Sequence, residues 1–278
     1  MKRACVIGWP IAHSRSPMIH TYWLRQYGIA GTYTKEPVKP EDVERFLQSL
    51  EANGLQGCNV TVPHKETAFA VAEIRDPSAL AVNAANTLWL EQGRIACANT
   101  DTYGFMANLE ASAPDWRQRT GPIMILGAGG SARAVVYGFL EAGMGDIRVF
   151  NRSPERAEQL ARHFGKHVSA YSWDMRNASL SDAAVIVNTT TLGMNGTEGP
   201  DIDFSRAPKS AVAADLVYVP LETEFLRLAR ANGLIGVDGL GMLLHQAVPG
   251  FEKWFGVRPT VTPELYKMVA DDIGGVTC

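Results

Sequence analysis

The stretch "IMILGAGGSARA", residues 123–134, decides the fold. Its four leading apolar residues are typical of a buried strand, and the helical pattern of residues 131–143 follows a glycine turn. The turn fits G-x-G-x-x-[GA], in which the first glycine permits a tight turn and the second lets the backbone approach a pyrophosphate. The helix start offers unpaired N–H groups to that anion. We therefore predict a dinucleotide-binding unit; a plain strand-to-helix turn is the alternative.

The end of the next strand indicates which dinucleotide binds. An NAD site usually places Asp or Glu there, to accept a hydrogen bond from the ribose 2′-hydroxyl. This chain has Asn151 and Arg152 instead, and Arg156 follows one helical turn later. Guanidinium groups suit a 2′-phosphate. The pattern favours NADP over the alternative of a solvated helix start with unrelated arginines.

Strands and helices alternate on both sides of this turn. The expected strands of a first unit are 3–9, 32–38, 55–63 and a hairpin over 86–101 that turns at Gln92-Gly93; its helices are 16–28, 40–54 and 65–74. A second unit follows the Pro-, Gly- and charge-rich stretch 110–122, with strands from 123, 146, 183, 211 and 234 and helices 131–143, 154–165 and 222–233. Two more helices, 241–256 and 262–273, close the chain. Such alternation predicts parallel sheets with right-handed crossovers.

Composition excludes several classes of protein. The 278 residues are 46% hydrophobic and carry a net charge of −3, which leaves no basic footprint for nucleic acid. The chain holds no run of about 18 apolar residues, so no membrane span is expected. Trp9-Pro10 interrupts the first apolar run, which argues against a secretory signal. The four cysteines (Cys5, Cys58, Cys97, Cys278) show no CxxC spacing and are expected to be reduced thiols of a cytoplasmic protein.

A second informative stretch is "NVTVPHKE", residues 59–66. A helix that starts near Pro63 places Lys65 in its first turn, where the helix dipole disfavours a cation by roughly 0.3–1 kcal/mol. The lysine is therefore either solvated and tolerated or required at that position. Asn59 and Thr61 alternate on one strand face and point the same way, which favours a polar site leading to Lys65.

Seven ordered motifs resemble those of the shikimate dehydrogenase family, from Val6 to about Trp254. They are "GWPIAHSRSPMIH" (8–20), "NVTVPHKE" (59–66), "ANTDTYGF" (98–105), "GAGGSARA" (127–134), "NRS" (151–153), "NTTTLGM" (188–194) and "DGLGMLLHQAVPGFEKWFG" (238–256). The resemblance implies reversible NADP-linked reduction of 3-dehydroshikimate to shikimate, on the route to chorismate and the aromatic amino acids. Three positions depart from the usual pattern: Asn83 replaces a glycine, and Ser153 and Thr191 are less common choices.

The resemblance also implies roles for individual residues. Lys65 matches the catalytic lysine and Asp101 the aspartate paired with it. The substrate carboxylate would be held by Ser14 and Ser16, and its hydroxyls by Asn59, Thr61, Asn86, Tyr218 and Gln246. The NADP site would comprise Gly127, Ala128, Gly129, Gly130, Ser131, Asn151, Arg152, Arg156 and Leu216, with Gly239 and Met242 near the nicotinamide. From position alone, the two serines could equally cap a helix at Ser16-Pro17, and Asp101 could cap one that begins at Thr102.

These observations predict two α/β domains with a cleft between them. Residues 1–101 plus 239–278 would form the substrate domain, and residues 102–238 a Rossmann-type NADP domain. Lys65 would give a proton to the ketone oxygen and take it back in the oxidative direction. We expect a small-molecule substrate, no metal, and a monomer or homodimer. The alternatives are a quinate/shikimate dehydrogenase of broader specificity and a non-enzymatic NADP-binding sensor, although a sensor should have lost Lys65 or Asp101.

Overall fold

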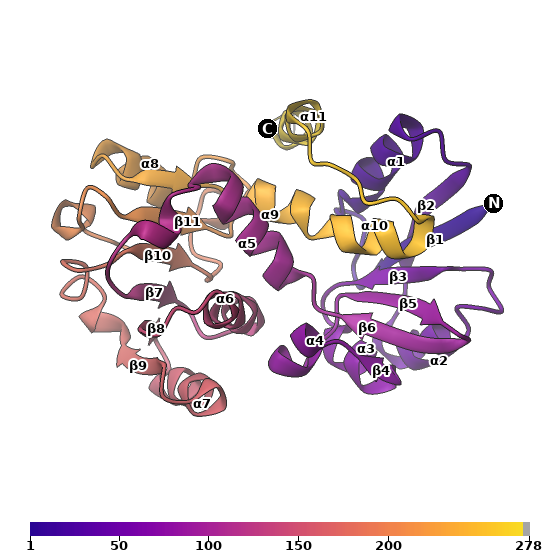
Figure 1. Ribbon diagram of the computed structural model, residues 1–278, viewed down its shortest axis with the longest axis horizontal. Helices are drawn as coiled ribbons and strands as arrows, with labels where there is room; N and C mark the ends of the chain where they lie inside the picture. The colour runs from indigo at the N-terminus through magenta and orange to yellow at the C-terminus, as the bar shows by residue number, and fades with distance from the viewer. Residues whose placement is uncertain (275–278) are drawn as a thin grey trace. The chain divides into compact units, whose positions relative to one another are not determined.

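The computed structural model describes residues 1–274, which form two compact units (Figure 1). The first unit comprises Met1–Gly104 and Leu244–Val269. The second comprises Phe105–Leu243 together with the described residues after Val269. Each unit contains a six-stranded sheet covered by helices, so the predicted α/β class is confirmed.

The sheet of the first unit has the strand order β2-β1-β3-β5-β6-β4. Its strands are β1 (Lys2–Gly8), β2 (Gly31–Pro37), β3 (Gly57–Val60), β4 (Ile74–Arg75), β5 (Thr87–Glu91) and β6 (Arg94–Ala98). The β1–β2, β1–β3 and β4–β6 pairs are parallel, whereas β5 is antiparallel to both of its neighbours. The predicted hairpin turns at Gln92 and Gly93, whose φ angles of +53° and +77° suit the tight two-residue turn that joins β5 to β6.

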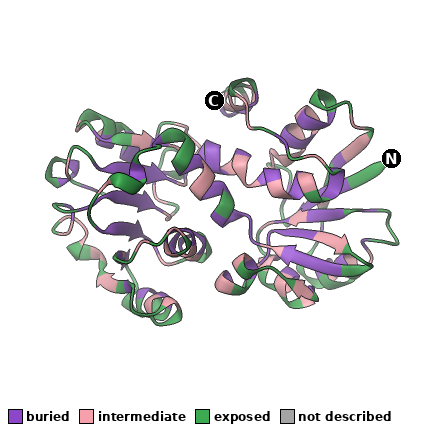
Figure 2. Cartoon of the chain, viewed as in Figure 1, coloured by how far each residue is buried: buried purple, intermediate pink, exposed green. Residues whose placement is uncertain are grey.

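Helices cover both faces of this sheet (Figure 1). The helices α1 (Ser16–Gln26) and α10 (Ala247–Phe255) pack on one face, where their aromatic side chains surround His20. The helices α2 (Val43–Gln48), α3 (Lys65–Val71) and α4 (Pro77–Val82) cover the other face. The inner strands β1, β3 and β6 are mostly buried between these layers, whereas the edge strands β2 and β4 are mostly half-buried or exposed (Figure 2). The 3₁₀ turn η1 (Pro40–Asp42) precedes α2, and α11 (Pro263–Gly274) closes the described chain.

His20 lies on the α1 side of the sheet with both ring nitrogens unbonded. Its imidazole stacks on the Tyr33 ring at 3.9 Å between centroids, and burial lowers its pKa from 6.5 to about 3. As the pH falls below 6.5 towards 3, the unfolded chain binds a proton at His20 and the folded protein does not. The free energy of unfolding is therefore at its full value above pH 6.5 and decreases as the pH falls through this range. The loss amounts to about 3 kcal/mol at a pH two units below 6.5.

His20→Phe keeps an aromatic ring in the stack and removes the titrating group. Between neutral pH and about pH 4.5, we expect the free energy of unfolding to decrease more for the wild-type protein than for the variant. The extra decrease should reach about 3 kcal/mol. Urea unfolding at a series of pH values measures both slopes. Parallel slopes would show that His20 does not contribute to the acid sensitivity of the fold.

The sheet of the second unit is entirely parallel, with the order β12-β11-β10-β7-β8-β9. Its strands are β7 (Ile123–Leu126), β8 (Ile147–Asn151), β9 (Val168–Ser172), β10 (Val185–Asn188), β11 (Val212–Asp215) and β12 (Ile235–Val237). Numbered along the chain from β7, this is the Rossmann order, in which the connection reverses direction between β7 and β10. Ligands of such sheets bind outside the carboxyl ends of the strands at this switch point.

Two hydrophobic clusters lie on the two faces of the second sheet. One joins the apolar sides of α5 (Asp101–Ser112), α6 (Gly130–Glu141) and α7 (Pro154–Phe164) to alternate strand residues such as Ile125 and Val149. The other joins α8 (Glu224–Ala231) to the opposite strand positions, such as Met124 and Ile186. The 3₁₀ turns of this unit are η2 (Trp116–Gln118), η3 (Trp173–Met175), η4 (Met194–Gly196) and η5 (Phe204–Arg206).

Several predicted elements differ in extent. The helix expected over 40–54 ends at Gln48, and the helix expected over 65–74 ends at Val71 because Ile74 pairs with β6 instead. The helix expected over 241–256 is interrupted at Gln246, between α9 (Gly239–His245) and α10. Strand β9 and helix α4 were not predicted, since β9 has only one buried residue, Val168, and α4 has only six residues.

The predicted domain boundary at residue 239 is displaced. Residues 239–243 group with the second unit, not with the first. Met242 is buried in the same cluster as Phe105 and Leu109. A side chain at Gly241 would overlap the Asn108 amide, whose Nδ2 donates to the Asp238 carbonyl at 2.7 Å. Packing against α5 therefore fixes the start of α9 in the second unit.

Within residues 1–274, no helix combines the length and apolar character that a membrane crossing requires. Cys5, Cys58 and Cys97 are buried free thiols, and Cys278 lies outside the described residues.

Candidate active site

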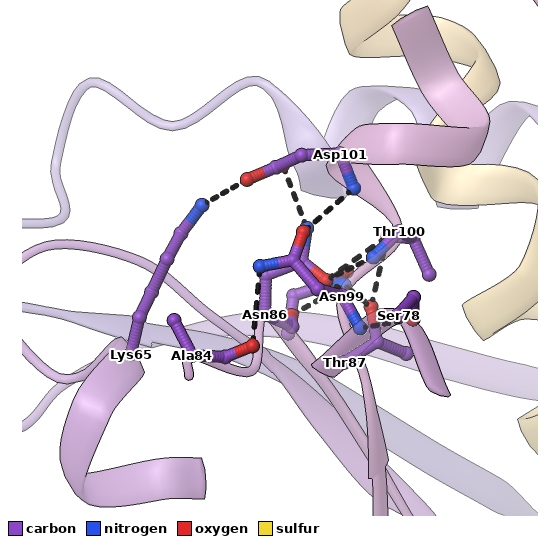
Figure 3. Close-up of polar contacts among 9 residues, drawn as sticks. Lys65, Ser78, Ala84, Asn86, Thr87, Asn99, Thr100 and Asp101 are labelled. Atoms are coloured by element: carbon purple, nitrogen blue, oxygen red, sulfur yellow. Dashed lines mark hydrogen bonds and ion pairs between the residues drawn. The ribbon is translucent and has the colours of Figure 1, made fainter. Parts of the chain in front are cut away.

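Lys65 and Asp101 form an ion pair in the first unit (Figure 3). The Lys65 Nζ lies 2.6 Å from Asp101 Oδ2, and the two side chains are 29% and 10% exposed. Lys65 is the first residue of α3, and Asp101 is the first residue of α5. The sequence therefore does place the lysine at a helix start, and the structure supplies the carboxylate that offsets the unfavourable helix dipole there.

The Asp101 carboxylate is oriented by amide groups. Its Oδ1 accepts a hydrogen bond from Asn86 Nδ2 at 2.8 Å, while Oδ2 accepts from Lys65. The Asp101 backbone N–H donates to Asn99 Oδ1 at 3.1 Å, and Asn99 Nδ2 donates to the Ala84 carbonyl at 3.2 Å. These bonds use both carboxylate oxygens and fix the start of α5, so Asp101 has little freedom to turn away from Lys65.

Asn86 and Asn59 are held by the neighbouring strands. Asn86 Oδ1 accepts from the Thr100 backbone N–H at 2.8 Å, which leaves its Nδ2 directed at Asp101. Asn59 Oδ1 accepts from the Tyr33 hydroxyl at 2.6 Å, and its Nδ2 donates to the Asn86 carbonyl and to Thr87 Oγ1. Both hydrogens of the Asn59 amide are thus used within the protein, so Asn59 offers a ligand only an acceptor.

Asn83, which stands where related motifs carry glycine, ends α4 in the left-handed conformation, with φ +54° and ψ +38°. Asparagine is one of the few residues with a side chain that tolerate this conformation. The backbone therefore keeps the path that glycine would give, and the hydrogen bonds of Asn86 remain intact.

The other predicted substrate residues of the first unit lie at element ends. Ser16 begins α1, and its backbone N–H donates to Ser14 Oγ at 3.3 Å. The two hydroxyl oxygens are also 3.3 Å apart, and no side chain caps α1. Thr61 directly follows β3, and Gln246 lies between α9 and α10. The serine pair thus combines a local turn with hydroxyls at a helix start.

The glycine turn of the second unit has the geometry that an anion site needs. Gly127 has φ +105°, and a Cβ there would lie 2.8 Å from Thr189 Oγ1, so only glycine fits. Added Cβ atoms at Gly129 and Gly130 would meet no atom within 4 Å. Helix α6 starts after Gly129 without a side-chain cap. Its first N–H groups therefore face open space at the switch point of the sheet.

The residues after β8 fit a phosphate. Asn151 Nδ2 donates to the Ser153 carbonyl at 2.9 Å and thereby shapes the turn into α7. Arg152 and Arg156 are exposed. Among the described residues, neither guanidinium forms an ion pair with a carboxylate. Two free guanidiniums beside an anion-binding turn suit the 2′-phosphate of NADP.

The last predicted residues lie beyond β11 and β12. Leu216 directly follows β11, and Tyr218 lies two residues further on. A Cβ at Gly239 would lie 2.3 Å from the Leu216 carbonyl oxygen, so this glycine permits a close backbone approach. Met242 is buried in the core beside α5. The structure thus gathers Leu216, Tyr218 and Gly239 at the carboxyl ends of neighbouring strands.

Three family models match most of the chain. The shikimate dehydrogenase substrate binding domain matches residues 6–88, shikimate/quinate 5-dehydrogenase residues 110–195, and the shikimate 5′-dehydrogenase C-terminal domain residues 239–262. A shikimate dehydrogenase (NADP(+)) of Brucella abortus is 56% identical over 275 residues, which cover 98% of this chain and 95% of the relative. The chain belongs to the shikimate dehydrogenase family.

Solved structures of shikimate dehydrogenases and their relatives share the fold. The shikimate 5-dehydrogenase from Thermus thermophilus in complex with NADP(H) and shikimate has a TM-score of 0.86 and 34% identity, and the match covers 98% of this chain and all of that one. Quinate dehydrogenase from Corynebacterium glutamicum in complex with NAD has a TM-score of 0.88 and 27% identity, with 97% and 99% coverage. Membership of the shikimate dehydrogenase family, predicted from the motifs, is therefore confirmed.

Four residues that support this site in the shikimate dehydrogenase fold were not predicted. They are Tyr33, Thr87, Asn99 and Thr100, which hydrogen-bond to Asn59, Asn86 or Asp101. Asn99 and Thr100 precede Asp101 in the quoted motif, so the sequence did contain a signal for them. Tyr33 lies on a strand far from every motif, and no sequence signal connects it to the site.

Proposed function

We propose that this protein is an NADP-dependent shikimate dehydrogenase that interconverts 3-dehydroshikimate and shikimate. The observation that carries the proposal is the Lys65–Asp101 pair, held by Asn86, in a chain of this family. Its relatives named shikimate dehydrogenase (NADP(+)) support the reaction and the cofactor. The lysine and aspartate are both present and paired, which weighs against a non-enzymatic sensor.

When bound, NADPH supplies the hydride for the ketone carbon of the substrate. The Lys65 ammonium donates a proton to the ketone oxygen, and in the oxidative direction the amine takes it from the hydroxyl. Asp101 fixes the position of Nζ through its 2.6 Å contact. Asn86 keeps the carboxylate in place and, with Asn59 and Thr61, would contact the substrate hydroxyls. Protonated lysine at this position stabilises the alkoxide that develops as the carbonyl is reduced.

The second unit would hold NADP through groups already described. The Gly127–Ser131 turn and the first N–H groups of α6 would receive the pyrophosphate. Arg152 and Arg156 would receive the 2′-phosphate, and Asn151 shapes their turn. Leu216, Gly239 and Met242 would contact the nicotinamide half, and Tyr218 and Gln246 the substrate.

Product identification tests this proposal. Purified protein should convert shikimate and NADP to 3-dehydroshikimate and NADPH, as read by NMR of the carbocycle. The likeness to the quinate dehydrogenase of Corynebacterium glutamicum makes quinate the competing substrate. Oxidation of quinate as fast as that of shikimate would favour the broader quinate/shikimate dehydrogenase, and no product from either substrate would contradict the proposal.

The serine pair provides a test of substrate binding. We expect Ser14→Ala and Ser16→Ala each to raise KM for shikimate more than they lower kcat, because a contact to the carboxylate is equal in the ground and transition states. Loss of one hydrogen bond to a charged group corresponds to about 1.5–3 kcal/mol, or tenfold and more in KM. Steady-state kinetics measures the changes in KM and kcat separately. Unchanged KM in both variants would leave the serines with only their helix-start role.

We further propose that the enzyme acts in the cytoplasm as a monomer or homodimer. The three buried cysteines are unpaired, which suits a reducing compartment. Fractionation of the source cells and sedimentation of the purified protein test the two statements separately.

A further inference from the structure

One buried carboxylate ties together the loops that follow β10 and β11. Asp215 is 1% exposed and ends β11, opposite Asn188 at the end of β10. Its Oδ1 accepts from Asn188 Nδ2 at 2.9 Å and from the Val217 N–H at 3.0 Å. Its Oδ2 accepts from Thr223 Oγ1 at 2.6 Å. The single carboxylate thus contacts a strand end, the next loop and the residue that starts α8.

Asn188 extends this network into the loop after β10. Its Oδ1 accepts from the Thr190 N–H at 3.1 Å and from Thr190 Oγ1 at 2.7 Å, and its Nδ2 also donates to the Leu192 carbonyl. Thr223 caps α8 by accepting from the Leu226 N–H. The Leu216 N–H, directly after Asp215, donates to the Asn188 carbonyl at 3.0 Å. The conformations of both loops therefore depend on Asp215.

A buried carboxylate with no cation opposes stability. Among the described residues, no lysine or arginine pairs with Asp215. Burial raises the pKa of its carboxyl to about 6, although hydrogen bonds from Thr223, Val217 and Asn188 act in the opposite direction. A buried polar group that lowers stability but has all its hydrogen bonds is typical of a functional site, where it fixes the positions of its neighbours.

The place of this network in the sheet indicates what it serves. The order β11-β10-β7-β8 sets the Gly127 turn after β7 between the arginines after β8 and the Asp215 network at β10 and β11. A dinucleotide whose pyrophosphate lies at the switch point extends to both sides of it. With the 2′-phosphate on the β8 side, the nicotinamide half falls on the β10–β11 side.

We infer that Asp215 is a positioning residue for the nicotinamide half of NADP, acting through the loops at Leu216 and Thr190. This inference rests on the proposed function. The adenosine end depends on Arg152 and Arg156 after β8, and neither of them hydrogen-bonds to the network. The Gly127 N–H donates to the Phe150 carbonyl and not to the network, while the Gly127 backbone packs beside Thr190. Replacing Asp215 should therefore weaken the binding of the whole dinucleotide and leave the binding of its adenosine end unchanged.

Calorimetric titration of Asp215→Asn with two ligands tests this. 2′,5′-ADP carries the 2′-phosphate and the adenosine but no nicotinamide. We expect the Kd for NADP to rise by about tenfold or more, while the Kd for 2′,5′-ADP stays within about twofold. Asp203→Asn is the matched control, because Asp203 is an exposed aspartate of the same unit that bonds Ser205 and Arg206 and does not touch the network. Its two Kd values should equal those of the wild type.

Other outcomes would overturn the inference. Equal weakening of both ligands would mean a general distortion of the unit, and two unchanged Kd values would mean a purely structural carboxylate. If Asp215→Asn does not fold, Thr223→Val removes one donor and should give the same selective loss, which Thr223→Ser should rescue. If the wild-type protein binds neither ligand, the proposed cofactor is wrong, which is a different result from a failure of the positioning role.

Discussion

Lys65→Ala is expected to keep the fold and shikimate binding and to lose about 10²–10⁴ of kcat, the usual contribution of general acid–base catalysis. The reason is the position of Nζ at the start of α3, where the helix dipole disfavours a cation and the Asp101 carboxylate, 2.6 Å away, holds the ammonium in place. The rate of NADPH formation at saturating shikimate measures kcat, and tryptophan fluorescence under titration measures shikimate binding.

Two further variants sharpen this result. Lys253→Ala is the matched control, because Lys253 is an exposed lysine of the same unit whose Nζ lies 4.4 Å from the centre of the Trp89 ring. Its kcat should stay within about twofold of wild type. Asp101→Asn should lose less kcat than Lys65→Ala, because it removes the partner and keeps the proton donor. A Lys65→Ala enzyme that turned over within a few-fold of wild type would show that another group moves the proton.

Arg152→Ala is expected to remove most of the preference for NADP over NAD. Each charge-assisted contact to the 2′-phosphate contributes about 1.5–3 kcal/mol, so two arginines imply discrimination of at least about a hundredfold before solvent screening. In the described structure both guanidiniums are exposed and lack carboxylate partners, so no competing ion pair must be broken. The variant should lose kcat/KM for NADP and keep that for NAD.

Salt and a neighbouring arginine provide the controls. The wild-type preference should shrink as ionic strength rises, because exposed charges are screened. Arg162→Ala changes another exposed arginine of α7, which pairs with Glu158, and should leave the preference unaltered. An Arg152→Ala enzyme that lost activity equally with both cofactors would show that Arg152 maintains the structure and does not read the 2′-phosphate.

The elements predicted from sequence are those with strong local signals. The glycine turn, the hairpin at Gln92-Gly93 and the parallel second sheet follow from backbone constraints that the residues themselves impose. Helix ends were less predictable, because tertiary pairing decides them: Ile74 joins β6 although it continues a helical pattern. The grouping of the start of α9 with the second unit was not predictable, because its packing against Asn108 is a long-range contact.

The site was predictable in part for the same reason. Lys65 and Asp101 belong to motifs, and the structure brings them together. Tyr33 and Thr87 act through hydrogen bonds across strands that only the sheet register brings near. Asp215 ends an apolar strand, and its sequence neighbourhood gives no sign that it is buried without a cation. Such contacts depend on the assembled fold and have no local pattern.

The substrate and cofactor preferences of the wild-type protein distinguish an NADP-linked shikimate dehydrogenase from its alternatives. The most direct test is kcat/KM for shikimate and for quinate, each with NADP and with NAD, on the purified wild-type protein. We expect the highest value for shikimate with NADP, above that for shikimate with NAD by about two orders of magnitude or more. Equal use of the two cofactors, or a higher value for quinate than for shikimate, would contradict this expectation.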